Sequence, residues 1–477
     1  SAEEAFSKHL IDAAVPAQQS KTLALRYVAG QPARSATPFS SVFLENASAR
    51  VLLNTQQQRK LAKDIDIEHY PAASRLLNLW QQYGGTLSNL QPVELNTFNQ
   101  LVLTNSTQNL LRLSQLKDQL KAFAPVTAKS FSTVHIIGAG HIGREIAAWC
   151  SLSGLTVSLQ ESNPENLSYA LERTRAIFNT YFQKDVVKLK AATERITVDN
   201  EGNGILYADI IIDATTDKLA SKQELLARLE EQSRPDALLA ITSSTLALER
   251  LAAVLLQPSR LIGLHFLYPI IQRELVEVTH LAKNTSTEII EQACSFVKQI
   301  NKLPLPIPST PGLLVNRILL TYIMQGIRLC QQNVPPVIID KAGRDFGMPL
   351  GPLEWADVLG LDYCLQLGET LAKTSPILIP DLLVEMVKSN GKLGRKNGAG
   401  FYRYRNGRML KPERAQWGGN TTALQDKLIN QMSEEAALCL EQGIIENPDL
   451  LDAAVVFGAG FPAFRGGPLQ YARSSRK

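Results

Sequence analysis

Two side chains in this sequence could work together as an acid–base pair. His265 lies near the end of the apolar run Arg260–Phe266, and Glu277 follows twelve residues later. A neutral imidazole can accept the proton of an alcohol while hydride leaves the carbon, provided that a carboxylate fixes its tautomer. The pair therefore predicts a general base and its orienting acid. The alternative interpretation is a core histidine satisfied by the backbone and a solvated strand carboxylate.

A glycine-rich motif could bind a dinucleotide. Gly138, Gly140 and Gly143 form a GxGxxG pattern directly after the apolar run Val134–Ile137. Glycines at this spacing allow a tight turn, a close approach of backbone N–H groups to a diphosphate, and close packing of the next helix. Glu161 comes 18 residues beyond Gly143, where a carboxylate would bind a ribose and repel the 2′-phosphate of NADP. The motif predicts NAD as the cofactor, with a surface acid as the alternative for Glu161.

The elements that must position these residues follow the pattern of a Rossmann-type α/β domain. From Val134 onward, short apolar runs alternate with amphipathic stretches, which predicts βαβ units and a doubly wound parallel sheet. His265 would then lie at the carboxyl edge of the sheet, where such folds bind ligands. The predicted strands are Val134–Ile137, Thr156–Gln160, Asp209–Asp213, Ala237–Thr242 and Arg260–Phe266.

A repeat appears in the helical pattern after Pro311. Phe346-Gly347 and Gly351-Pro352 return as Phe457-Gly458 and Gly467-Pro468, at offsets of 111 and 116 residues. The repeat predicts two duplicated all-α domains that pack as two subunits of a homodimer would. We therefore expect the chain to be a monomer through internal duplication.

The chain length indicates several domains. We expect a mostly helical segment at 1–130, ending in a linker at 124–132, and the NAD-binding domain at 131–310. The first helical copy would occupy 311–420 and a second, shorter copy 421–477.

Composition excludes several classes of protein. A net charge of +4 over 477 residues gives no electrostatic reason for a nucleic-acid partner. The sequence has no apolar run long enough for a transmembrane segment and no signal-peptide pattern, so we expect an intracellular, cytoplasmic protein, with mitochondria or peroxisomes as alternatives. Its five cysteines are scattered and never spaced as CxxC, so we expect neither a disulfide framework nor a metal site.

From Val134 to its end the sequence resembles the 3-hydroxyacyl-CoA dehydrogenase family, and its duplicated helical end resembles the dehydrogenase part of multifunctional fatty-acid β-oxidation enzymes of the alpha-subunit type. The 1–130 segment resembles the last helices of an enoyl-CoA hydratase domain and its linker. Matching stretches in the dehydrogenase part are GAGHIG from Gly138, GLHF from Gly263, LVEV from Leu275, Phe346–Asp362, Gly391–Tyr404 and Phe457–Pro468.

The resemblance implies roles for individual residues. His265 would be the general base and Glu277 the acid that holds it, while Ser244 and Asn316 would contact the 3-oxygen of the substrate. It also implies that Asp217 and Lys222 lie by the nicotinamide side of the cofactor or the substrate. As alternatives, Ser244 would be a turn residue and Asn316 a helix-capping or surface group.

The sequence departs from the family pattern at several positions. Thr242 and Tyr268 stand where the family usually has Asn, and Ile142 stands where it usually has Met. Glu161 stands where the family usually has Asp, and Asp217 stands where it usually has Glu, so both changes preserve the charge. Tyr268 is the larger change, because a phenol three residues from His265 could reshape the pocket and lower activity or alter chain-length preference.

The resemblance implies NAD-dependent oxidation of (S)-3-hydroxyacyl-CoA to 3-ketoacyl-CoA, with acyl-CoA as substrate and a thiolase subunit as a possible partner. One alternative is a catalytically weak scaffold that binds NAD or acyl-CoA, prompted by Tyr268 and Thr242. Another is a dehydrogenase of other hydroxy acids on the same fold. The duplication favours the β-oxidation type.

Overall fold

The computed structural model describes residues 14–15, 17–30, 46–84, 87–125, 129–182, 185–413 and 415–475. Parts of the predicted N-terminal segment and linker, including 1–13, 31–45 and 126–128, lie outside the described residues. The chain divides into two units between Thr104 and Asn105. In the part that the structure describes, no helix is long and apolar enough to cross a membrane.

The first unit is helical, as predicted. It contains α2 (Ala17–Ala29), α4 (Ala47–Asp64), α5 (Ala72–Tyr83) and α6 (Leu87–Val102). Helices α4 and α5 are joined by polar contacts, including a 3.1 Å hydrogen bond from Asn54 to Asn78. Among the described apolar side chains of this unit, only Ala49 and Leu79 are buried. Its helices therefore enclose little apolar core.

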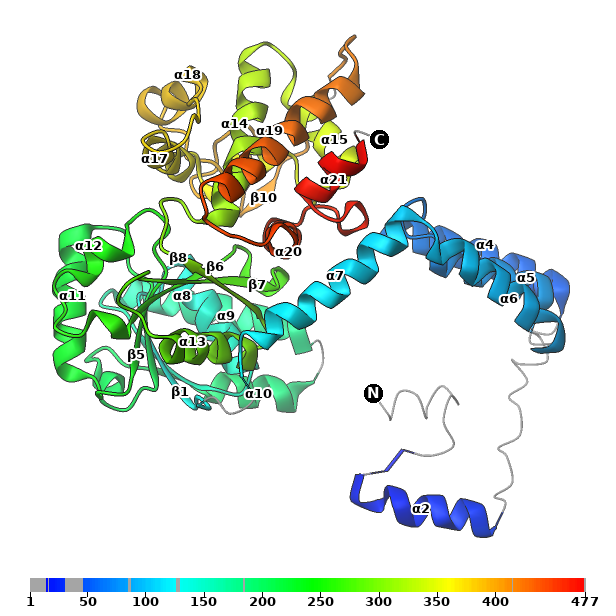
Figure 1. Cartoon of the computed structure of the whole chain (residues 1–477), viewed down its shortest axis with the longest axis horizontal. Coiled ribbons are helices and arrows are strands. Elements are labelled where there is room, and N and C mark those ends of the chain that lie inside the picture. Colours follow the sequence, from blue (N-terminus) through cyan, green and yellow to red (C-terminus); the bar gives the residue numbers. More distant parts are fainter. Residues whose placement is uncertain are drawn as a thin grey trace. The chain divides into compact units, whose positions relative to one another are not determined.

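The second unit contains an eight-stranded sheet in the order β3-β2-β1-β4-β5-β6-β7-β8 (Figure 1). Strands β1 to β6 are parallel, β7 is antiparallel to β6, and β8 is parallel to β7. The five predicted strands are confirmed to within one residue at each end. The strands are β1 (Thr133–Ile137), β2 (Thr156–Gln160), β3 (Ile196–Val198), β4 (Ile210–Asp213), β5 (Leu238–Ile241), β6 (Leu261–Phe266), β7 (Leu275–His280) and β8 (Leu303–Pro308).

Helices cover both faces of this sheet because its central strands are apolar on both sides. On β4, Ile210 and Ile212 pack with α8, α9 and α13, whereas Ile211 packs with α11 and α12 on the other face. This arrangement confirms the Rossmann-type prediction. The covering helices are α8 (His141–Leu152), α9 (Pro164–Phe182), α10 (Val186–Glu194), α11 (Leu219–Gln232), α12 (Leu248–Ala252) and α13 (Thr287–Gln299).

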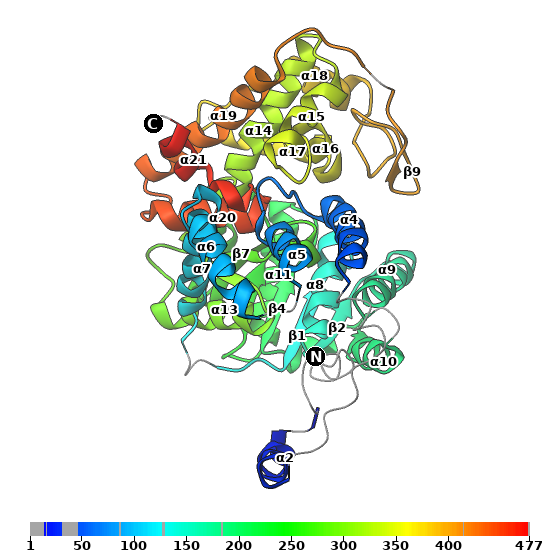
Figure 2. The same cartoon turned by 90° about the vertical axis from the view of Figure 1, so that its right-hand side faces the viewer.

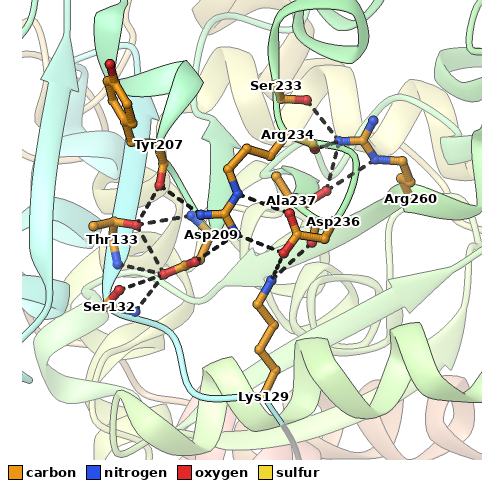
Figure 3. A network of polar contacts seen from close by, with 10 residues as sticks. All are labelled: Lys129, Ser132, Thr133, Tyr207, Asp209, Ser233, Arg234, Asp236, Ala237 and Arg260. Atoms are coloured by element: carbon orange, nitrogen blue, oxygen red, sulfur yellow. Dashed lines mark hydrogen bonds and ion pairs between the residues drawn. The ribbon is translucent and has the colours of Figure 1, made fainter.

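A polar network fixes the amino edge of the sheet (Figure 3). One carboxylate oxygen of Asp209 accepts the backbone N–H groups of Ser132 and Thr133, at 2.8 and 3.0 Å. Arg234 reaches the other oxygen at 3.4 Å and also pairs with Asp236 at 2.8 Å. The network ties the segment before β1 to the segments before β4 and β5.

Helices fill the rest of this unit (Figure 2). The α-helices here are α7 (Asn105–Ala122), α14 (Leu314–Gln331), α15 (Pro336–Phe346), α16 (Pro352–Leu359), α17 (Leu361–Leu371), the one-turn α18 (Asp381–Val384), α19 (Thr421–Glu441), α20 (Pro448–Ala459) and α21 (Pro468–Ser475). Short helices occur at η1 (Asn203–Leu206), η2 (Pro258–Arg260), η3 (Ile270–Gln272), η4 (Glu385–Ser389) and η5 (Ala463–Arg465), and β9 (Tyr404–Arg405) pairs with β10 (Arg408–Met409).

The duplication of the helical part is visible in matching contacts. In the first copy, the buried Asp340 accepts the N–H of Leu353 at 2.8 Å, and in the second copy Asp452 accepts the N–H of Leu469 at 2.8 Å. A Cβ on Gly351 or Gly467 would collide with the carboxylate of its own copy. The glycines of the two Gly-Pro pairs therefore leave room for equivalent buried acids.

The two copies share one hydrophobic core. That core includes α14 and α15 of the first copy, α19 and α20 of the second, and residues of α7 and β8. The predicted boundaries at 130, 310 and 420 stay a prediction.

Candidate active site

The register of the β6–β7 hairpin brings His265 and Glu277 together. The two residues are direct cross-strand partners, and His265 Nδ1 lies 2.5 Å from Glu277 Oε2. Glu277 is fully buried, so the alternative of a solvated carboxylate is wrong. Its Oε1 accepts the N–H of Val315 at 3.0 Å, in the first turn of α14. The positive end of the helix dipole stabilises the buried carboxylate at that position.

Asn316 fixes the tautomer of His265. The amide nitrogen of Asn316 lies 3.1 Å from His265 Nε2 and, since an amide nitrogen only donates, Nε2 accepts. The ring proton is then on Nδ1, where it is donated to Glu277. In this arrangement the Nε2 lone pair lies on the side of Asn316, and this is the tautomer that a general base requires.

A tyrosine that the sequence did not single out completes the cluster. The hydroxyl of Tyr363, on α17, lies 2.7 Å from Ser244 Oγ and accepts the amide of Asn316 at 2.8 Å. Burial raises the pKa of Tyr363 well above its usual value, so the hydroxyl is protonated at neutral pH. Tyr363 stands among the apolar residues of a helix, where nothing in the pattern distinguishes it from a core aromatic residue.

Asp217 and Lys222 lie beside the Ser244 loop. Asp217 Oδ2 accepts the hydroxyls of Ser243 and Thr245 at 2.8 and 2.7 Å. Lys222 is fully buried, donates to Asp213 at 2.9 Å, and lies 3.9 Å from Asp217. The lysine therefore fixes the ends of β4 and its following loop, and its contact with a cofactor stays a prediction.

The glycine-rich loop has the shape that a dinucleotide needs. Gly138 has φ +98°, and a Cβ on Gly143 would come within 1.9 Å of the Gly138 carbonyl, so both positions require glycine. Gly140 is exposed at the N-terminus of α8, and a Cβ there would meet no atom within 4 Å. Glu161 accepts the N–H of Ala139 at 3.0 Å at the end of β2. The loop leaves open space at a helix N-terminus, which fits a diphosphate.

The two unusual residues near this loop are not in the hydrogen-bonded cluster. The ring of Tyr268 packs edge-on against His141, with centroids 5.7 Å apart. Thr242 donates its hydroxyl to the Asp213 carbonyl at 3.3 Å, between the ends of β4 and β5. Tyr268 therefore borders the nucleotide loop, and its effect on activity stays a hypothesis.

Family models match two adjacent parts of the chain, which together make up more than half of it. Residues 133–310 match the model described as 3-hydroxyacyl-CoA dehydrogenase, NAD binding domain, and residues 312–404 match the model described as 3-hydroxyacyl-CoA dehydrogenase, C-terminal domain. The chain belongs to the 3-hydroxyacyl-CoA dehydrogenase family. It is an NAD-dependent oxidoreductase by family, which confirms the resemblance and NAD as the cofactor.

A curated relative of this dehydrogenase supports the family assignment. The fatty acid oxidation complex subunit alpha of Pseudomonas putida is 29% identical over 404 residues, and the match covers 80% of this chain but 56% of the relative. The chain thus spans little more than half the length of the curated relatives it matches.

Solved structures share the fold of the dehydrogenase part. A 3-hydroxybutyryl-CoA dehydrogenase of Escherichia coli K12 superposes with a TM-score of 0.62 at 24% identity, covering 73% of this chain and 92% of that one. An (S)-3-hydroxybutyryl-CoA dehydrogenase of Ralstonia eutropha superposes with a TM-score of 0.53 at 29% identity, covering 58% of this chain and 100% of that one.

Proposed function

We propose that this dehydrogenase oxidises (S)-3-hydroxyacyl-CoA to 3-ketoacyl-CoA with NAD, with His265 as the general base and Glu277 as its orienting acid. One observation supports this assignment most strongly. A continuous hydrogen-bonded chain runs from the buried Glu277 through His265 to Asn316. It presents the imidazole of His265 at the carboxyl edge of a dinucleotide-binding sheet, where an alcohol can lose its proton.

In this mechanism His265 Nε2 accepts the proton of the 3-hydroxyl group. The resulting imidazolium is stabilised by Glu277, which already accepts the hydrogen bond of Nδ1–H. Ser244 and Asn316 hold the 3-oxygen while its charge changes. NAD, when bound, supplies the hydride acceptor. In the reverse direction, the protonated His265 returns its proton to the ketone oxygen.

The cofactor site is assigned to the first βα turn of the sheet. Gly138, Gly140 and Gly143 would surround the diphosphate, and the carboxylate of Glu161 would bind the adenosine ribose. Asp217 would lie toward the nicotinamide. It is held by the hydrogen bonds that it accepts from the hydroxyls of Ser243 and Thr245, and Lys222 lies nearby.

The wider role follows the names of the curated relatives. We assign the chain to fatty-acid β-oxidation as part of a multifunctional alpha-type subunit, with residues 1–130 as the hydratase-derived helices and linker. A thiolase subunit as partner, a monomeric state and a cytoplasmic location belong to the same proposal.

A scaffold that binds acyl-CoA without turnover is the second candidate, and one observation favours it. The polar groups that would meet the substrate oxygen are hydrogen-bonded to one another through Tyr363. An active enzyme must open this cluster for every substrate molecule.

Absorbance at 340 nm distinguishes the candidates. We expect NADH consumption with acetoacetyl-CoA and NADH formation with (S)- but not (R)-3-hydroxybutyryl-CoA. Binding of NADH without turnover of either substrate would support the scaffold. Turnover of hydroxy acids that lack CoA, with none of the thioesters, would support the third possibility, a dehydrogenase of other hydroxy acids.

A further inference from the structure

The hydroxyl of Tyr363 is shared by two residues assigned to the substrate oxygen. Ser244 follows β5 in the NAD-binding part, whereas Asn316 lies in the first turn of α14. The Tyr363 hydroxyl lies 2.7 Å from the Ser244 hydroxyl and 2.8 Å from the Asn316 amide nitrogen. It therefore links the sheet to the helical part directly beside the dyad.

The cluster leaves little of His265 exposed. His265 is 7% exposed, and its Nε2 already accepts from Asn316. A substrate oxygen that reaches Nε2 must consequently replace an existing hydrogen bond within the cluster.

A phenol hydroxyl has the hydrogen-bonding capacity of an alcohol, with one donor and two acceptor lone pairs. We propose that the Tyr363 hydroxyl occupies, in the free protein, the place that the 3-oxygen of the substrate takes, and that the substrate binds by displacing it. Tyr363 is thereby a specificity-determining residue for the proposed reaction, on which this inference rests.

The consequence is selectivity for a ligand that carries an oxygen at C3. Such an oxygen restores the hydrogen bonds of Ser244 and Asn316 that Tyr363 gives up. An acyl-CoA without it cannot restore them and therefore binds with Tyr363 still in place, because buried polar groups left unpaired would destabilise the complex.

The Tyr363→Phe variant removes the hydroxyl and keeps the ring. Without the competing hydroxyl, Ser244 and Asn316 are available to the ligand, so the dissociation constant of acetoacetyl-CoA should fall about tenfold. That of butyryl-CoA, which lacks an oxygen at C3, should change by less than about twofold. Tyr322→Phe is the matched control, because it removes a buried hydroxyl that donates to the Leu350 carbonyl at 3.2 Å in the same helical part. The Tyr322→Phe protein should bind acetoacetyl-CoA and butyryl-CoA with wild-type dissociation constants.

Isothermal titration calorimetry of the two ligands, with NAD saturating, measures both constants. NAD and acetoacetyl-CoA are both in the oxidised state, so no turnover disturbs the titration. Equal changes for the two ligands would show a merely structural role and overturn the inference. Weaker or undetectable binding of acetoacetyl-CoA to Tyr363→Phe would also overturn it, because the hydroxyl would then be assisting the bound oxygen.

The outcome is separate from that of the proposed function. If the wild type reduces acetoacetyl-CoA but Tyr363→Phe binds it no more tightly, the inference fails and the function stands. If turnover is absent but the selective tightening occurs, the oxygen site and its displacement by ligand stand without the dehydrogenase activity.

Discussion

At the residue scale, the charge of Glu277 is held by groups on two separate elements. Its oxygens accept from His265 on β6 and from the Val315 N–H on α14. A buried carboxylate is tolerated when its hydrogen bonds are complete and a helix N-terminus lies next to it. The same contacts that satisfy the buried carboxylate of Glu277 also orient the imidazole of His265.

Asp340 predicts a pH dependence of stability. Burial raises the pKa of Asp340 to about 7, although hydrogen bonds from Tyr402 and Leu353 oppose the shift. Because the folded state holds this proton more tightly than the unfolded state, its stabilising contribution is present at low pH. That contribution decreases as pH rises from about 4 to about 7.

Asp340→Asn tests this directly. The variant cannot ionise, so its free energy of unfolding should fall less between pH 5 and pH 7.5 than that of the wild type, by an amount on the order of 1–3 kcal/mol. Urea unfolding at both pH values measures the difference. The same slope in both proteins would show that Asp340 titrates at its ordinary pKa.

At the element scale, the strands and the loop that could be predicted from the sequence are those marked by apolar residues or by glycine spacing. Strands β4, β5 and β6 could be predicted because burial on both faces leaves apolar runs, β2 because its buried residues alternate with more exposed ones, and the loop from Gly138 to Gly143 because of its glycine spacing. Strand β3 has only three residues, and β8 carries prolines at 304, 306 and 308, which its edge position permits because its outer N–H groups need no partner. Neither strand therefore shows a pattern from which a strand could be predicted.

The pairing of side chains between distant elements could not be predicted from spacing alone. His265 and Glu277 meet because the antiparallel register of β6 and β7 makes them direct cross-strand partners. Tyr363 on α17 meets Ser244, which follows β5, in a tertiary contact between residues 119 apart in the sequence.

The nucleotide loop predicts different effects for two glycines. Gly143→Ala places a Cβ 1.9 Å from the Gly138 carbonyl, so the turn must shift, and we expect a lower Tm together with at least tenfold weaker NADH binding. Gly140→Ala meets no protein atom within 4 Å, so its Tm should stay within about 2 °C. Its NADH binding should still weaken, because the methyl group enters the space assigned to the diphosphate.

Thermal melts and NADH fluorescence titrations report the two effects separately. Wild-type NADH affinity in Gly140→Ala would place the diphosphate elsewhere. An unchanged Tm in Gly143→Ala would show that the turn is less constrained than this packing implies.

Helix α7 predicts a stabilising contact with the second helical copy. Arg112 pairs with Asp449 at 2.6 Å and with the fully buried Asp452 at 2.9 Å. Arg112→Leu leaves the Asp452 carboxylate without a cation, which should lower the free energy of unfolding by about 2–4 kcal/mol.

Lys117→Met on the same helix is the control. It removes the more exposed pair with Glu274, so the expected change is below about 1 kcal/mol. Both values come from urea unfolding. Equal effects of the two variants would contradict the role given to Arg112.

At the scale of the whole molecule, the two helical copies behave as one folded body. They share a hydrophobic core and use the same buried acid, Asp340 or Asp452, at the same place. A second copy within the chain can cover the surface that a partner subunit would otherwise cover.

We therefore expect the protein to sediment as a monomer whose specific activity is independent of concentration. Sedimentation velocity and activity should be measured over the same hundredfold range of protein concentration. Activity that rises together with a dimer population would contradict the proposal that the internal duplication replaces a partner.

The central claim, that His265 and Glu277 perform the acid–base chemistry, is tested most directly by the turnover of NADH with acetoacetyl-CoA in variants of the dyad. His265→Gln and Glu277→Gln should each lower kcat by two to four orders of magnitude, roughly the contribution of a positioned general base, while NADH still binds. His280→Gln, a histidine at the end of β7 outside the dyad, should keep wild-type turnover. A kcat within tenfold of the wild type in either dyad variant would contradict the mechanism.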